Sequence, residues 1–291
     1  MYYYIINPAA GKGAINNIQD KLRSRLTELG ISGEFAKTTG PGDAAKIAEL
    51  AVKKGMNTIV AVGGDDTVNE VINGISRENN TAIGIIPTGS SNLLAGHLGI
   101  HDWQQACEVL AARRITSYGL IAAGQKFFLS TLVLGFETQL EDRAENGSKE
   151  GLKDKIKQFK TSFDQAKNFK PLKCKITVDS KYELTSPLFS LTVANQKFDN
   201  PLADNKLIIS LTEKPSRWDL TNYAWQLLKK TPGRLENIST RVKADRAVIE
   251  INPETQVMID GNLAGKTPIV IRLTDRRIRF ITEKQSGNFK N

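Results

Sequence analysis

Cysteine and histidine are scarce in this chain of 291 residues, which contains two of each. Cys107 and Cys174 have no CxxC partner, so the sequence lacks the spacing of a zinc site or a dithiol redox centre. A reducing cytoplasm is therefore the expected compartment. His97 and His101 are spaced i, i+4, but Gly99 between them and the lack of a third ligand nearby argue against a metal site.

Long apolar runs are missing as well. No stretch approaches the roughly 18 apolar residues that a membrane-spanning helix needs. The N-terminal apolar run stops at Asn7-Pro8, which is too early for the apolar region of a signal peptide. We therefore expect any contact with a membrane to be peripheral.

The composition is that of an ordinary globular protein, with 40% hydrophobic and 24% charged residues. The length predicts about two domains. Lys and Arg number 40 against 31 Asp and Glu, which gives a formal net charge of +9. This excess suits anionic partners such as nucleotides, nucleic acids or acidic lipid surfaces.

The first part of the chain alternates short β-rich runs with helical patterns, which is typical of an α/β domain with a parallel sheet. Strands are predicted at residues 1–6, 32–36, 58–62 and 83–86, and helices at 18–29 and 43–53. The later part is rich in strands, predicted at 127–136, 174–178, 188–194, 207–211, 247–251 and 269–273. We expect an α/β domain at 1–120 and a β-rich, antiparallel, sandwich-like domain at 121–291. Nothing local decides whether the segment after Leu273 returns to the first domain.

Two helical patterns interrupt the β-rich part. The first, at 152–169, is lysine-rich and is favoured as a surface helix with a solvated face, with docking on an anionic bilayer as the alternative. The second, at 219–230, accounts for Tyr223 and Trp225 as packed residues beside Trp218, and no motif of an RNA-binding module is present. We therefore expect no nucleic-acid partner.

Three loops that follow predicted strands carry the chemistry. Val62 to Val71 contains Gly63-Gly64-Asp65, and paired glycines at the end of a strand let backbone N–H groups approach a phosphate. The other two loops are Asn7 to Gly13, with Gly11-Lys12-Gly13, and Pro87 to Asn92. None of them matches a Walker P-loop or a GxGxxG dinucleotide motif.

Together these loops resemble the diacylglycerol kinase catalytic-domain family of lipid kinases, which includes bacterial diacylglycerol kinases and is related to sphingosine kinases. The matches run almost end to end: NPxxG at Asn7–Gly11, TxxxGDA at Thr38–Ala44, GGDGTxNE at Gly63–Glu70 and PxGTxN at Pro87–Asn92. Gly135-Phe136, Asn195, Asp204 and Asp260-Gly261 match further motifs in the second half.

The resemblance implies an ATP- and Mg²⁺-dependent kinase that transfers the γ-phosphoryl group to the hydroxyl of a diacylglycerol-like or related lipid. It implies a three-layer α/β nucleotide-binding domain, a cleft for the nucleotide, and a β-rich domain that brings the lipid. The enzyme is expected in the cytoplasm, peripherally associated with anionic membrane. Its oligomeric state is left open, a homodimer included.

The resemblance also assigns the site residues. Asp260 is the candidate base, and Asp204 is a candidate ligand of a structural metal. Lys12 and the amides of Gly63-Gly64 would counter the triphosphate, and Asp65 could help to hold the ion. The cofactor-binding set is Asn7, Gly11, Lys12, Thr38, Gly63, Gly64, Asp65, Asp66, Thr67, Asn69, Glu70, Gly89, Ser90 and Asn92.

Departures from the family motifs bear on activity. Asp66 stands where the last Gly of GGDG is expected, and two like charges about 4 Å apart repel by roughly 4 kcal/mol at an effective dielectric of ~20. Asn262 replaces the Glu of DGE, which removes a possible base. Asn205 and Leu93 replace a Gly and an Asp, which are milder changes.

Two alternatives follow. A catalytically weak or dead relative that binds lipid or nucleotide is supported by Asp66 and Asn262. An NAD kinase-like enzyme would share GGDGT and NE, but the Asn7–Gly11 loop, Asn195 and Asp260-Gly261 favour the lipid kinase.

Overall fold

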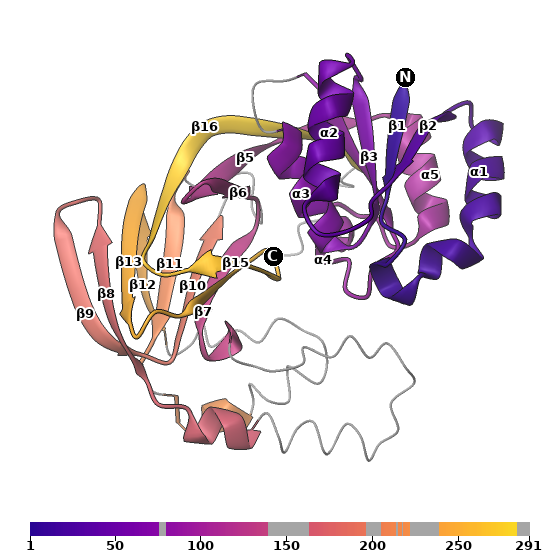
Figure 1. Cartoon of the computed structure of the whole chain (residues 1–291). Coiled ribbons are helices and arrows are strands. Elements are labelled where there is room, and N and C mark those ends of the chain that lie inside the picture. The colour runs from indigo at the N-terminus through magenta and orange to yellow at the C-terminus, as the bar shows by residue number, and fades with distance from the viewer. Residues whose placement is uncertain are drawn as a thin grey trace, which may run out of the picture. The chain divides into compact units, whose positions relative to one another are not determined.

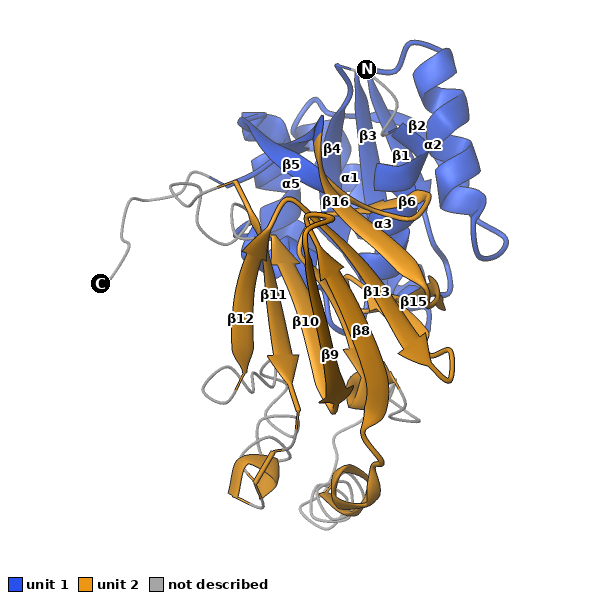
Figure 2. Cartoon of the chain, turned by 90° about the vertical axis from the view of Figure 1, so that its left-hand side faces the viewer, with its two compact units in different colours: residues 1–120, 275–291 blue, residues 121–274 orange. Residues whose placement is uncertain are grey.

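A computed structural model of the chain describes residues 1–75, 80–138, 163–195, 205–213, 215–216, 218–221 and 239–283 (Figure 1). The chain forms two compact units, which Figure 2 colours separately. Unit 1 consists of Met1–Leu120 and Asp275–Asn291, and unit 2 of Ile121–Thr274. Two strands, β5 (Ile115–Ala123) and β16 (Ile269–Ile281), contribute residues to both units.

Unit 1 is built on a mostly parallel sheet. Its strands are β1 (Tyr2–Ile6), β2 (Gly33–Lys37), β3 (Thr58–Gly63) and β4 (Ala82–Pro87). β1 pairs with β2 and β3, β3 pairs with β4, and the last residues of β16 pair in parallel with β4. β3 and β4 are buried along their whole length, as expected for strands covered on both faces.

The helices of unit 1 connect these strands. They are α1 (Gln19–Glu28), α2 (Asp43–Lys53), α3 (Asp65–Ile75), α4 (Leu93–His97) and α5 (Trp103–Ala112), preceded by the short 3-10 turns η1 (Ala10–Lys12) and η2 (Ala14–Asn17). α2 packs on α3 and α1 on α5, so that helices flank the sheet on both sides (Figure 1). The loops that lead from β1, β3 and β4 into the next elements therefore lie at one edge of the sheet.

Unit 2 is a sandwich of antiparallel strands. One sheet joins the first residues of β16 to β13 (Arg246–Asn252), β8 (Leu172–Val178) and β9 (Tyr182–Leu188). The other runs in the order β12 (Thr240–Ala244), β11 (Leu207–Thr212), β10 (Ser190–Asn195), β7 (Thr131–Gly135), β14 (Gln256–Ile259) and β15 (Asn262–Lys266). Side chains from both sheets, among them Ile176, Ile249, Leu191 and Leu134, form one buried core. The fold class predicted from the sequence is confirmed.

The predicted strand at 127–136 is wrong in one respect, because it is broken in the structure. β6 (Lys126–Phe128) ends before β7 begins, and Phe136 opens the 3-10 turn η3 (Phe136–Thr138). The turn follows from Gly135, whose φ is 101°, and a Cβ there would lie 2.5 Å from the carbonyl oxygen of Phe189.

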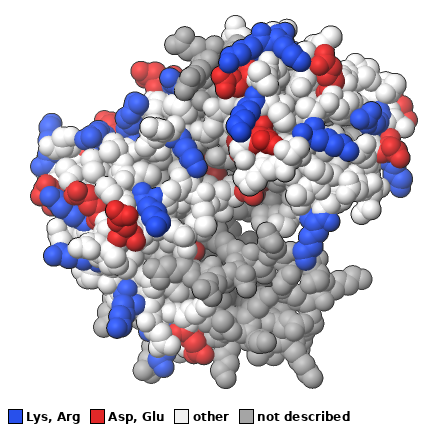
Figure 3. Space-filling view, viewed as in Figure 1, with Lys and Arg blue, Asp and Glu red and all other residues white. Residues whose placement is uncertain are grey.

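Several predictions fall partly or wholly outside the described residues. The predicted helix at 152–169 is described only from 163, where residues 163–168 are helical. The helix at 219–230 is described only over its first turn, and Asp204 is not described. In the described parts of the chain no helix is long and apolar enough to cross a membrane. On the face shown in Figure 3, Lys and Arg are interspersed with Asp and Glu.

Candidate functional site

Three loops of unit 1 meet at the carboxyl ends of its parallel strands, where open α/β sheets bind ligands. They span residues 7–13 after β1, 63–64 after β3 and 87–92 after β4. Backbone hydrogen bonds tie them together: Asn7 donates its N–H to Val62 O (2.9 Å), and Thr88 donates its N–H to Gly63 O (3.0 Å). The structure therefore brings together the three loops that the sequence indicated.

The loops touch through backbone that only glycine allows. A Cβ on Gly89 would lie 2.4 Å from Gly64 Cα, and a Cβ on Gly11 would lie 2.1 Å from Thr88 O. Because no side chain fits at these contacts, peptide groups rather than side chains line the meeting point. Such a lining suits the close approach of an anion such as phosphate.

The first loop bends through three successive residues in the left-handed region. Gly11, Lys12 and Gly13 have φ values of 56°, 58° and 81°. Glycine adopts this conformation readily, but Lys12 carries a Cβ and is held there at a cost of about 1 kcal/mol. Lys12 is exposed, so its charge is available to solvent at this edge of the sheet.

Asn7 and Thr67 join the first loop to α3. Asn7 Nδ2 donates to Thr67 Oγ1 (3.0 Å), and Asn7 Oδ1 accepts from the N–H of Ala9 (3.0 Å). The buried Thr67 side chain lies so close to Gly63 that a Cβ there would be 2.3 Å from Thr67 Oγ1. The two motif residues therefore set the shape of the loop.

Glu70 binds the first turn of α2. Its two carboxylate oxygens accept from the N–H groups of Gly42 (2.7 Å) and Ala44 (3.0 Å), which are among the donors that a helix start leaves unpaired. Thr38 is buried, and its N–H donates to Ile6 O. The contact between Glu70 and the start of α2 explains why a Glu in one motif accompanies a Gly-Asp-Ala in another.

Asp65 likewise accepts hydrogen bonds from the start of α4. Its two oxygens accept from the N–H groups of Leu93 and Leu94, both at 2.9 Å. Burial raises the pKa of this carboxyl, and the two hydrogen bonds oppose the rise. Asn92, with φ 51°, closes the loop by accepting from Gly89 N (2.9 Å) and donating to Gly89 O (2.8 Å).

Asp66 and Ser90 are exposed at the site. Asp66 is the second residue of α3 and has helical backbone, so this position does not need the conformational freedom of glycine. Asn69 accepts from Asn73 Nδ2 through its side-chain oxygen (3.2 Å) and its carbonyl oxygen (2.9 Å). Of the adjacent acids Asp65 and Asp66, only Asp66 is exposed.

Sequence reasoning missed Thr88. The residue is only 5% exposed, and its Oγ1 has no hydrogen-bond partner within the part of the chain that the structure describes. It occupies the variable position of PxGTxN, so no sequence signal could have singled it out.

Asp260 lies in unit 2, in the turn between β14 and β15. Ile259 pairs with Asn262, and Asp260 and Gly261 have φ values of 46° and 90°. Positive φ at both central residues is what a type I′ hairpin turn requires, and Asp-Gly is a preferred pair there. The turn alone therefore accounts for two residues of the motif.

The Asp260 carboxylate is held by the backbone at the break between β6 and β7. Its oxygens accept from the N–H groups of Leu129 (3.0 Å), Ser130 (2.9 Å) and Thr131 (3.0 Å), and its own N–H donates to Thr131 O (2.8 Å). The residue is 7% exposed. A proton transferred to this carboxylate would have to compete with three donors.

Asn262 adds an amide beside this turn. Its Nδ2 is buried and has no hydrogen-bond partner among the residues described here. Amide nitrogen donates hydrogen bonds, so Asn262 cannot serve as the proton acceptor that a Glu could provide. Of the other motif residues in unit 2, Asn195 donates its N–H to Ser130 O (2.9 Å), and the Phe136 ring stacks on Phe189 with ring centroids 5.0 Å apart.

A buried acid that the sequence did not indicate follows Phe136. Glu137 is 7% exposed, and its Oε1 accepts from Ser190 Oγ (2.7 Å).

Among the described residues no group of three or more His, Cys, Asp or Glu could hold a metal ion. Burial raises the pKa of Cys107 to about 11 and that of Cys174 to about 12, which keeps both thiols protonated at neutral pH.

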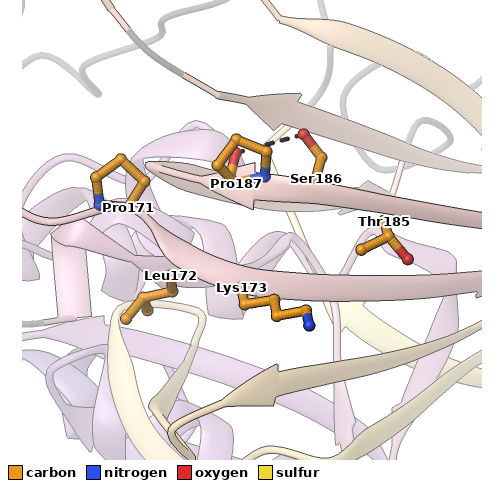
Figure 4. A pocket seen from close by; sticks show the side chains of 6 residues that line it. All are labelled: Pro171, Leu172, Lys173, Thr185, Ser186 and Pro187. Atoms are coloured by element: carbon orange, nitrogen blue, oxygen red, sulfur yellow. Dashed lines mark hydrogen bonds between the residues drawn. The ribbon is translucent and has the colours of Figure 1, made fainter.

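Two hollows occur in unit 2. The one in Figure 4 has a volume of about 310 Å³ and is lined by β8 and β9 and the residue before β8: Pro171, Leu172, Lys173, Thr185, Ser186 and Pro187. The other, of about 420 Å³, is largely apolar and lies among β8, β9, β11 and β12. Neither is lined by a residue of the motifs.

Comparison with known proteins agrees with the motifs. Residues 1–123 match the family model of the diacylglycerol kinase catalytic domain. The chain is 24% identical to a diacylglycerol kinase of Bacillus subtilis (strain 168), over 97% of this chain and 96% of the relative. It is 26% identical to a diacylglycerol kinase of Staphylococcus haemolyticus (strain JCSC1435), over 98% of this chain and 88% of the relative.

Solved structures share the fold. A crystal structure of a diacylglycerol kinase from Bacillus anthracis (strain Sterne) aligns with a TM-score of 0.70 at 21% identity, covering 97% of each chain. An NAD kinase from Archaeoglobus fulgidus, solved in complex with ATP, aligns with a TM-score of 0.53 at 14% identity, covering 98% of this chain and 94% of that one. Residues 1–123 are therefore similar to the diacylglycerol kinase catalytic-domain family, and the chain is similar to bacterial diacylglycerol kinases along nearly its whole length.

Proposed function

We propose that this protein is a lipid kinase that binds ATP with Mg²⁺ and transfers the γ-phosphoryl group to a lipid hydroxyl. The observation that carries the proposal is the meeting of three glycine-containing loops, backbone against backbone, at the carboxyl edge of the sheet. This edge lies in the part of the chain that matches the catalytic-domain family.

The residues of unit 1 would bind the nucleotide mainly by position and charge. Peptide groups of Gly63, Gly64 and Gly89 would line the phosphates, and Lys12 would offset their negative charge. Mg²⁺ carried by the phosphates neutralises charge in phosphoryl transfer. Both oxygens of Asp65 already accept hydrogen bonds from α4, whereas Asp66 is exposed at this edge, where its charge would oppose that of the phosphates.

The lipid acceptor is proposed to be diacylglycerol or a related lipid, as the names of the bacterial relatives suggest. Unit 2 would supply the acceptor side of the reaction. Asp260 remains the candidate base, and Asp204 remains a candidate metal ligand outside the described residues. We further propose a cytoplasmic protein that associates peripherally with anionic membrane, which its net charge of +9 favours.

One observation favours a second candidate function. The three backbone donors on Asp260, together with Asn262 in place of Glu, describe a turn that is well ordered but poor in proton acceptors. A relative that binds nucleotide or lipid and transfers phosphate slowly or not at all fits this turn. The similarity to an NAD kinase is one of fold and adds no argument for that activity.

The test combines calorimetric titration of Mg²⁺-ATP with transfer of γ-labelled phosphate to vesicles that contain diacylglycerol or a long-chain amino alcohol. NAD serves as a third acceptor. Binding with transfer to a lipid supports the kinase. Binding without transfer, with transfer gained in Asn262→Glu, supports the second candidate. Transfer to NAD alone, or no nucleotide binding, overturns the proposed activity.

A further inference from the structure

Thr88 occupies a position that the family motif leaves variable, yet it lies where the three loops of the candidate nucleotide site meet. Its N–H donates to Gly63 O (3.0 Å), and its carbonyl oxygen lies against Gly11. The next residue, Gly89, lies against Gly64. Thr88 therefore contacts the loops from both neighbouring motifs.

The Thr88 hydroxyl is buried at this point and unsatisfied by the residues that the structure describes. The side chain is 5% exposed, and Oγ1 finds no hydrogen-bond partner in the described parts of the protein. A buried hydroxyl without a partner is unfavourable and uncommon, and it calls for a specific explanation such as a ligand.

A second unfavourable feature lies in the loop that contacts the carbonyl oxygen of Thr88. Lys12, between Gly11 and Gly13, is held at φ 58°. Residues in sparsely populated conformations cluster at binding sites and switch regions. Gly11, the residue before this lysine, lies against the carbonyl oxygen of Thr88, so the strained turn and the residue with the buried hydroxyl are in contact.

We propose that the Thr88 hydroxyl is a phosphate-binding group of this protein. When the Gly11–Gly13 turn moves aside for a phosphate, Oγ1 donates a hydrogen bond to an anionic phosphate oxygen, a bond stronger than one between neutral groups. This inference rests on the proposed function, because it requires that nucleotide binds at this edge of the sheet. The inference adds a residue that contributes to phosphate affinity and whose identity the motif does not specify.

Thr58 provides a matched control. It is fully buried at the start of β3, and its Oγ1 likewise has no hydrogen-bond partner among the residues that the structure describes. The start of β3 is the opposite edge of the parallel sheet from the three loops. Thr58 thus has the same buried hydroxyl as Thr88 but lies away from the candidate nucleotide site.

The experiment compares Thr88→Val, Thr88→Ser and Thr58→Val with the unchanged protein. Calorimetric titrations with Mg²⁺-ATP and with inorganic tripolyphosphate measure affinity, and thermal unfolding without ligand measures stability. Valine keeps the shape of threonine but removes the hydroxyl. We expect Thr88→Val to weaken both ligands about tenfold or more, Thr88→Ser to stay within about threefold, and Thr58→Val to bind like the unchanged protein.

The stability readout separates a ligand-binding hydroxyl from a structural one. Both valine variants should unfold at the same temperature as the unchanged protein or higher, because neither hydroxyl forms a hydrogen bond with any residue that the structure describes. Unchanged affinity in Thr88→Val overturns the proposal. So does a lowered unfolding temperature in Thr88→Val, because it would reveal a structural bond. If the unchanged protein binds neither ligand, the proposed nucleotide binding itself is overturned and this inference falls with it.

Discussion

Asp66 is a single residue whose effects on stability and on binding should have opposite signs. Its carboxylate lies in the first turn of α3, where a negative charge complements the helix dipole. The same charge repels a phosphate at the end of β3. Since Asp66 is exposed, solvent screens this repulsion from roughly 4 kcal/mol at an effective dielectric of ~20 towards about 1 kcal/mol.

We predict that Asp66→Asn binds Mg²⁺-ATP about fivefold more tightly at low salt and unfolds at a slightly lower temperature. The gain in affinity should shrink in about 0.5 M salt. Asp66→Gly also removes the charge and is the control for shape; it should bind no more tightly than Asp66→Asn because the backbone here is already helical. Titrations at two salt concentrations measure the effect, and weaker binding by Asp66→Asn would show that the carboxylate assists the ion.

Asp260 is the other residue whose role the structure specifies. We predict that Asp260→Asn lowers the free energy of unfolding by about 3 kcal/mol, since an amide supplies one acceptor oxygen for three backbone donors and adds a donor of its own. Denaturant unfolding measures the loss. The exposed Asp245→Asn is a suitable comparison in the same unit, with an expected change below about 1 kcal/mol. A loss of transfer in Asp260→Asn without loss of stability would restore Asp260 as a base.

At the scale of elements, acids from one part of the sequence hold the starts of helices from another. Glu70, on α3, binds the first turn of α2, and Asp65 binds the start of α4. Helix starts leave N–H groups without partners in the helix, and these side chains supply the missing acceptors. Some motif residues therefore line the site, while others, such as Glu70 and Asp65, stabilise the helix starts next to its loops.

We predict that Glu70→Ala lowers the free energy of unfolding by about 2 kcal/mol, because it leaves two N–H groups of α2 without acceptors. Glu70→Gln should lose about half as much, since it keeps one acceptor oxygen. Glu49→Ala, an exposed substitution on α2 itself, is the control, with an expected change of about 0.5 kcal/mol or less. Equal stability of Glu70→Ala and Glu49→Ala would contradict the assignment.

The start of α2 should also be sensitive to pH through Asp43. Hydrogen bonds from Thr39 Oγ1, then Thr39 N–H, lower the pKa of this carboxyl, with Gly40 N–H contributing less. A lowered pKa means that Asp43 stabilises the fold above its ordinary pKa and that this contribution is lost as pH falls through the lowered value. We expect the unchanged protein to exceed Asp43→Asn in unfolding temperature near pH 7 and to lose this advantage below about pH 4. A difference in unfolding temperature between the two proteins that stays constant from about pH 7 to below about pH 4 would contradict this role of Asp43.

For the whole molecule, the net charge of +9 is the property that bears on membranes. We predict stronger binding to vesicles with anionic lipid than to zwitterionic vesicles at low salt, and a loss of this preference in about 0.5 M salt. Co-sedimentation measures the bound fraction. Equal partitioning between the two kinds of vesicle at low salt would remove the electrostatic argument for membrane association.

Much of the fold could be predicted because its signals are local. The buried apolar run of β3 and the helical spacing of α2, which begins and ends where predicted, need only neighbouring residues to be recognised. Strands with polar sequences, such as β9 with Glu183 and Thr185, were missed because their pairing rather than their composition makes them strands.

The sequence by itself determined the two kinds of structure, the three loops and the resemblance to a family, since each rests on short motifs and on periodicity along the chain. Only the tertiary structure decided what individual side chains do. Asp65, Glu70 and Asp260 contact backbone far away in the chain, and the Thr88 hydroxyl is defined by the loops packed around it. No local pattern records such contacts, because they exist only once the hydrophobic cores have brought distant segments together.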